Sequence, residues 1–230
     1  MAGSRRYGEL LRGIQRLRRA LLPAKFDPTG SYRSPERVHL RAVSFRILVH
    51  AEIESFLEDR AFDLFDAAWQ SWNRDNIPSR VITALLAFSA VATAPPPGKL
   101  GGDPGSQKSY DDFKHPVQKA QACWRSLHKD NHGVKEANVL GLLLPLGIAP
   151  SDLDTTLLAD LTSFGADRGA VAHQSSVQVG QYADPQVENQ RVQQLVTSLL
   201  PLDSVIDAGI NEVRMLSNAL ITQRAPRPRS

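Results

Sequence analysis

The sequence has a single cysteine, Cys123, among 230 residues, so no disulfide can form within the chain. A disulfide-based fold is excluded, and a reducing compartment, the cytoplasm, is expected. No run of about 18 apolar residues occurs, which predicts no membrane-spanning helix. Alternating apolar and polar positions are scarce, and the one candidate strand, 176–182, is weak. The hydrophobic content of 42% and the charged content of 22% are typical of a soluble globular protein.

Positive charge is concentrated at the N-terminus. Residues 1–41 contain ten Lys or Arg and three acidic residues, whereas acidic residues are in excess in the remainder. Arginines alternate there with leucines and Ile14 at spacings of three and four, which predicts a basic amphipathic helix. Three hypotheses remain open: packing of the apolar stripe on the body, contact with a nucleic acid or acidic partner, and a mitochondrial transit peptide. The second assigns Arg12, Arg16 and Arg19 to RNA binding.

A long helix is predicted from Ser34, with Ser34 as N-cap and Pro35 in the first turn. Apolar residues then recur every three or four positions for about 38 residues. Such a helix is longer than a small domain needs, and it is expected to form the spine of the fold. Aromatic residues on its apolar side, Phe56, Phe65, Trp69 and Trp72, exceed what a small bundle can cover, which predicts a symmetric dimer.

Three further helices are predicted at 79–93, 117–132 and 135–146. A fourth is predicted to begin at a capping box formed by Ser151 and Asp154 and to end at Gly165. The last is predicted from 184 to about 223, with a kink at Pro201. The fold class is therefore all-α, one bundle of five or six helices with long first and last members. Residues 1–33 form a basic extension to the helical domain 34–223. A Pro/Gly-rich loop at 94–115 interrupts that domain, and a basic tail occupies 224–230.

The segment FGADRGAVAHQSS, residues 164–176, has the most informative chemistry. Arg168 and His173 are five residues apart, about 140° around a straight helix. The two side chains converge only if Arg168 lies at the start of a helix. Gly165 and Gly169 would give the backbone the freedom to turn there, and Asp167 would be the N-cap. An Arg and a His at a helix N-terminus suit a phosphate, since Arg binds it with two donors and His transfers protons near neutral pH. A structural ion pair is the alternative.

Two blocks of the sequence resemble the HEPN superfamily, and within it the RiboL-PSP-HEPN type. The first is RILVHAEIESFLEDRAFDLF, residues 46–65, which resembles the first long helix of that group. The second runs from NVLGLLLPLGI, residues 138–148, to RGAVAHQ, residues 168–174, and resembles its Arg-x₄₋₆-His signature. The resemblance covers about half of the chain and implies a HEPN-like helical bundle.

The resemblance implies metal-independent RNA cleavage without a cofactor, with Arg168 and His173 catalytic. Two protomers are needed because one supplies a single motif His, whereas the reaction uses both a base and an acid. The resemblance therefore implies a homodimer that acts on RNA. It also implies a setting in prokaryotic defence or a toxin–antitoxin system, with an antitoxin or defence protein as partner. Gly169 and Gln174 depart from the polar residue and the glycine common at those positions. A non-catalytic module that binds RNA or protein is therefore the alternative.

Other polar residues suggest further hypotheses. Arg46, His50 and Glu54 share one row of the long helix, and they form either a surface ion-pair row or part of the cleft, with Glu54 orienting Arg168 or His50 contacting the phosphate. Asp167 and Gln174 are expected to support the same cleft. His128 and His132 lack the further ligands of a metal site, so no metal is predicted.

Overall fold

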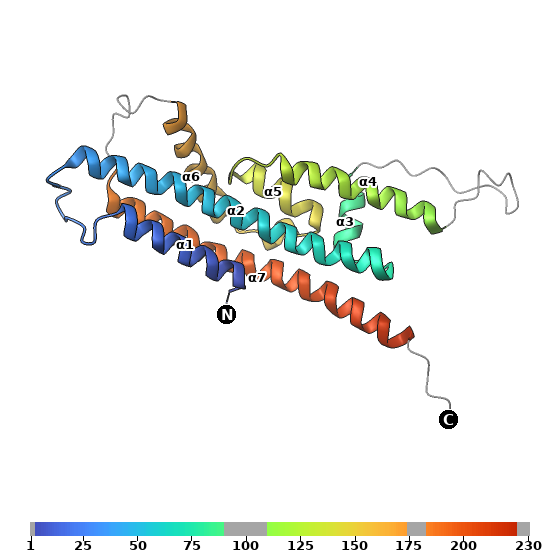
Figure 1. Cartoon of the computed structure of the whole chain (residues 1–230). Helices are drawn as coiled ribbons and strands as arrows, with labels where there is room; N and C mark the ends of the chain where they lie inside the picture. The colour runs from blue at the N-terminus through green and yellow to red at the C-terminus, as the bar shows by residue number, and fades with distance from the viewer. Residues whose placement is uncertain (1–2, 90–109, 174–182, 225–230) are drawn as a thin grey trace, which may run out of the picture.

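A computed structural model describes residues 3–89, 110–173 and 183–224, with the backbone alone at 110–113, 168–173 and 221–224. The described residues are helical and contain no strand, which confirms the all-α class. The candidate strand at 176–182 lies outside them. Figure 1 shows an elongated bundle in which two long helices run side by side for most of its length.

Helix α2 (Pro35–Asp75) is the predicted spine, with Ser34 as its N-cap and Pro35 as its first residue. Its 41 residues rise about 60 Å. The apolar stripe is buried along the whole length, from Ala42 to Trp72. The helix ends where Asn76 takes a left-handed conformation, with a φ of 55°. Asparagine tolerates this conformation better than most residues do.

Helix α7 (Pro185–Arg224) runs parallel to α2 (Figure 1). Side-chain bonds join Arg46 to Glu188, Arg60 to Asp203 and Arg74 to Ser217, pairs that are 142 or 143 residues apart. A constant separation means that the two helices keep one register along the pair. Asp184 caps α7 by accepting from the backbone N–H groups of Gln186 and Val187, at the start that the sequence predicts for this helix. The helix includes Pro201.

Helix α1 (Arg5–Leu21) packs antiparallel to α2 and also contacts α7. Arg6 bonds to Asp59 near one end, and Arg41 donates to the carbonyl of Ala20 near the other. Leu10 is fully buried and belongs to the same core as α2 and α7. The predicted basic amphipathic helix is confirmed, and its apolar side packs into the core of the domain.

The middle helices differ from their predicted bounds. Helix α3 spans Arg80–Phe88, α4 spans Tyr110–Lys129 and α5 spans Glu136–Leu143, followed by the 3₁₀ turn η2 (Leu144–Leu146). Part of the expected loop, 110–115, is thus helical, and Pro116 lies inside α4. Residues 90–109 lie outside the described part.

Helix α6 (Thr155–His173) begins later than predicted. The 3₁₀ turn η3 (Pro150–Asp152) occupies the expected start, and Asp154 accepts from the N–H of Thr156 at 2.8 Å. The Ser151–Asp154 capping box is therefore wrong. Pro150 at the first position of the short turn separates Ser151 from the helix.

The four aromatic residues of α2 in the dimer prediction pack against the chain itself, with Trp69 only partly buried. Phe56 and Phe65 are fully buried and Trp72 is 8% exposed. The Phe65 ring stacks on Trp124, whose indole N–H donates to the carbonyl of Leu142 at 3.1 Å. The argument for a dimer from an excess of aromatic surface on α2 is therefore removed. No described helix has both the length and the apolar character needed to cross a membrane.

Candidate functional site

Helix α6 continues through Gly165, where a stop was predicted. A Cβ atom at Gly165 would lie 3.1 Å from Lys135 Cγ, 3.6 Å from Val134 Cγ2 and 3.7 Å from His50 Nε2. The glycine therefore allows α6 to approach α2 and the segment before α5, and it does not end a helix. Close packing, not backbone freedom, explains this residue.

Arg168 and His173 lie on the C-terminal part of α6, and their side chains are outside the described part of the chain. Because α6 is continuous from Thr155, the expected position of Arg168 at a helix start is wrong. Five residues on a continuous helix separate their Cα directions by about 140°. Gln174 lies outside the described residues. Figure 1 shows the C-terminal end of α6 standing clear of α1, α2 and α7.

Asp167 is not an N-cap, because it lies within α6. Its carboxylate accepts a hydrogen bond at 2.5 Å from Nη1 of Arg191, which comes from α7. Nη2 of Arg191 donates to Oγ of Ser163 at 2.8 Å, and the guanidinium carbon lies 5.3 Å from the centre of the Phe164 ring. One arginine thus contacts a full turn of α6, immediately before Arg168.

Arg46 and Glu188 form a second link between the long helices near the same turn. Nε of Arg46 donates to Oε2 of Glu188 at 2.9 Å, and Nη2 donates to Oε1. The hydrogen bonds to Glu188 raise the pKa of Arg46 against the opposing effect of burial, and the charges of Glu188 and Asp167 add to the increase. The two hydrogen bonds of this pair hold α2 to α7.

His50 and Glu54 complete the predicted row on α2. Nδ1 of His50 lies 3.5 Å from Oε2 of Glu54, and the ring stacks on Phe164 with centroids 6.0 Å apart. His50 is only 1% exposed, so the row is an interior feature and not a surface ion-pair row. The row lies against α6, beside Gly165. It supports the α6 segment that leads into Arg168.

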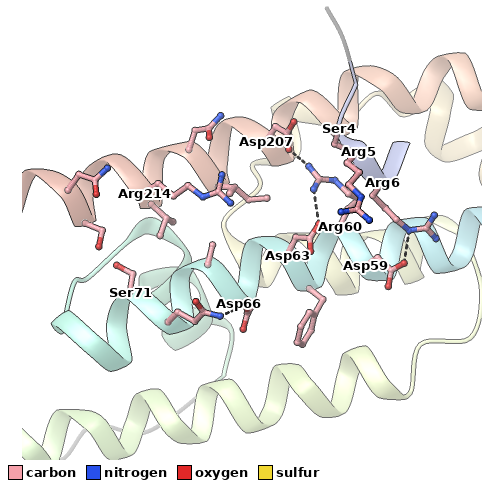
Figure 2. A pocket seen from close by; sticks show the side chains of 18 of the residues that line it. Ser4, Arg5, Arg6, Asp59, Arg60, Asp63, Asp66, Ser71, Asp207 and Arg214 are labelled. Carbon is pink, nitrogen blue, oxygen red and sulfur yellow. Dashed lines mark hydrogen bonds and ion pairs between the residues drawn. The ribbon is translucent and has the colours of Figure 1, made fainter. Parts of the chain in front are cut away.

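A second polar cluster lies between the C-terminal halves of α2 and α7, in a groove of about 990 Å³ (Figure 2). Arg60, which is 4% exposed, donates to Asp203 at 2.7 Å, to Asp63 at 2.8 Å and to Asp207. Burial lowers the pKa of Arg60, but these carboxylates outweigh burial and raise it. Asp203 also accepts from the N–H and hydroxyl of Ser4. The cluster joins α1, α2 and α7.

Arg12, Arg16 and Arg19 are all exposed on α1. Leu10, Ile14 and Leu17 pack on the core while Leu11 is 44% exposed, so core packing and an outward arginine row coexist on this helix.

His128 takes part in local contacts, whereas His132 is exposed. His128 Nε2 lies 3.2 Å from the carbonyl of Glu58, and its ring lies 5.2 Å from that of Trp124. Among the described residues, no three His, Cys, Asp or Glu side chains gather as a metal site would require.

Glu188 and Arg191 are the supporting residues that sequence reasoning missed. They lie three residues apart in the first two turns of α7, in no motif. An acidic residue in a first turn is common because it favours the helix dipole. Only the register of α7 against α2 and α6 gives these residues a role at the site. Comparison with protein-family models, curated proteins and solved structures finds no match.

Proposed function

We propose that this chain is a metal-independent endoribonuclease of HEPN type, in which Arg168 and His173 form a composite site between two copies. The observation that carries the proposal is the support given to α6: Arg191 holds Ser163 and Asp167, one residue before Arg168. A catalytic helix must be held within a fraction of an ångström, because small misplacements cost large factors in rate. The resemblance of residues 46–65 and 138–174 to HEPN ribonucleases supplies the reaction.

The reaction needs three things from the protein. A base removes the proton from the ribose 2′-hydroxyl, whose oxygen attacks the adjacent phosphorus. An acid protonates the 5′-oxygen that leaves, and positive charge stabilises the pentacovalent phosphorane. The products are a 2′,3′-cyclic phosphate and a 5′-hydroxyl. Two copies of His173 supply base and acid, and two copies of Arg168 supply the charge.

Exposed apolar side chains support a second copy at this end of the molecule. Leu40 and Leu48 on α2 are 58% and 44% exposed, and Val187 on α7 is 57% exposed. The register of the long helices places Val187 level with Arg46, beside the stretch that α6 contacts. A partner copy that covers these side chains would lie close to the projecting end of α6. We assign the activity to the cytoplasm, in prokaryotic defence or toxin–antitoxin regulation with an antitoxin or defence protein as partner.

The second candidate is a non-catalytic module that binds RNA or protein on the same scaffold. The continuity of α6 favours it, because five residues along one helix place the Cα atoms of Arg168 and His173 about 140° apart around the helix axis. Gly169 and Gln174 also favour it, since neither matches the pattern common in HEPN ribonucleases.

Incubation of the purified protein with varied RNAs in EDTA separates the two candidates. We expect cleavage to persist in the chelator and to leave cyclic-phosphate and 5′-hydroxyl ends. His173→Ala and Arg168→Ala are each expected to reduce the rate by about 10²–10⁴ while leaving the melting temperature unchanged. Binding without cleavage would replace the ribonuclease with the module. Cleavage that His173→Ala leaves intact would refute the assigned residues.

A further inference from the structure

The outer side of α1 carries a row of arginines. Arg12, Arg16 and Arg19 follow one another at intervals of four and three residues, and all three are exposed. The helical rise separates the first from the last by about 10 Å. With Glu9 and Gln15 they line a hollow of about 370 Å³, which contains no apolar side chain.

The charge of this row is not balanced within the described part of the chain. Glu9 is the one acidic residue that lines the hollow, and its carboxylate accepts from Nε of Arg5 at 2.9 Å. No described carboxylate forms an ion pair with Arg12, Arg16 or Arg19. Three guanidinium groups therefore present their donors to solvent, in the planar arrangement that binds phosphate with two hydrogen bonds.

Helix α1, which carries the row, is held in place at both ends. Ser4 bonds to Asp203, and the hydroxyl of Tyr7 donates to the carbonyl of Val196 at 2.9 Å. Arg41 holds the other end of α1 through the carbonyl of Ala20. Since α1 is already ordered, a ligand spends no affinity on folding the helix that carries the arginines.

The burial of α1 also selects the ligand. Leu10, Ile14 and Leu17 pack on the core, so this helix cannot place its apolar side in a membrane as interfacial helices do. A protein partner needs an apolar anchor at the centre of its contact, and the hollow offers none. An extended polyanion needs only the arginines.

We infer that Arg12, Arg16 and Arg19 form a docking site for the phosphate backbone of single-stranded RNA, separate from Arg168 and His173. The choice of RNA rests on the proposed function, whereas the anionic character of the ligand follows from the row itself. Contacts to phosphate carry no information about the bases, so binding through this row is expected to be independent of sequence and sensitive to salt. Its role is to hold RNA on the protein while another segment is cleaved.

The test uses fluorescence anisotropy with a labelled 2′-O-methyl RNA, which cannot be cleaved through its 2′-oxygen. Affinity is measured over a range of salt concentrations for the wild type and for Arg12→Gln/Arg16→Gln/Arg19→Gln. The binding constant falls as salt rises, and each lost phosphate contact makes the negative slope of log K against log salt shallower by about 0.7 for a single strand. The triple variant is therefore expected to lose about two units of slope, with an unchanged melting temperature because all three residues are exposed.

Lys119→Gln/Lys129→Gln/Arg214→Gln is the matched control. It removes the same charge from exposed positions on α4 and α7. The control is expected to keep the wild-type slope. Equal losses in both variants, an unchanged slope in the α1 variant, or no RNA binding by the wild type would overturn the inference. So would binding to phosphatidylserine vesicles that the α1 variant loses while RNA binding is unaffected. Failure to cleave unmodified RNA, with the slope difference intact, would refute the proposed ribonuclease and leave this site standing.

Discussion

Arg191 of α7 donates from Nη1 to Oδ2 of Asp167 at 2.5 Å, and Asp167 immediately precedes Arg168 on α6. The same guanidinium donates to Ser163 one turn earlier. Side-chain exposures of 26% for Arg191 and 44% for Asp167 make this a partly solvated pair, whose contribution to stability is at most about 1 kcal/mol. Its consequence for the position of α6 is larger than its energy.

Arg191→Gln tests that consequence. We expect the rate of RNA cleavage to fall by about 10- to 100-fold, because Arg168 loses the contact that positions its turn. Urea unfolding is expected to show a loss of about 1 kcal/mol or less. Arg191→Lys should restore part of the rate. Arg74→Gln removes the bonds of a 67% exposed side chain to Asp75 and Ser217, far from α6, and should leave the rate unchanged. A rate that Arg191→Gln does not alter would show that the contact is only structural.

Arg60→Met is expected to destabilise the protein far more than it alters any site. Asp203 is 0% exposed, so removal of its partner leaves a buried carboxylate without a cation. The loss is expected to be about 3–5 kcal/mol in urea unfolding. Asp203→Asn in the same chain should recover part of it, since the uncompensated charge is then gone. A loss as small as that of Arg74→Gln would contradict the assigned role of Arg60.

Tyr7 predicts a decline in stability at alkaline pH. Burial, with a smaller effect from the charge of Asp203, raises the pKa of Tyr7 above its usual value of 10.0. The folded state therefore retains a proton that the unfolded state loses first, so this contribution is complete below pH 10 and disappears as the pH rises through the folded pKa. Unfolding measured from pH 8 upward should show the decline, and Tyr7→Phe should reduce it. An equal decline in both proteins would assign it to other groups.

Sequence reasoning located the long helices well and the local roles around α6 poorly. The bounds of α2 and α7 followed from periodic apolar residues and from Pro35 and Pro185 at the first positions. Gly165 was misread because a glycine that ends a helix and one that admits a neighbouring helix look alike in sequence. The distinction depends on Val134 and Lys135, which tertiary packing brings to α6.

Long-range ion pairs were hidden for the same reason. Arg60 and Asp203 are 143 residues apart, and no spacing rule within one helix connects them. Asp167 looked like an N-cap because its partner Arg191 belongs to another helix. The basic row of α1 was predictable, because exposure and burial on an amphipathic helix follow directly from its period.

The proposed composite site requires two copies of the chain. Light scattering at micromolar concentration is expected to report about twice 25.3 kDa, and dilution should lower the specific cleavage rate as dimers separate. Leu48→Arg/Val187→Arg places charge on exposed apolar positions near the α6 contact. We expect this variant to be a monomer. Its cleavage rate is expected to fall by about 10²–10⁴, because each site then lacks its second His173. Met215→Arg, at a 71% exposed position near the other end of α7, is the matched control and should change neither mass nor rate. A wild-type monomer that cleaves RNA would refute the composite site, because one copy would then supply both acid and base.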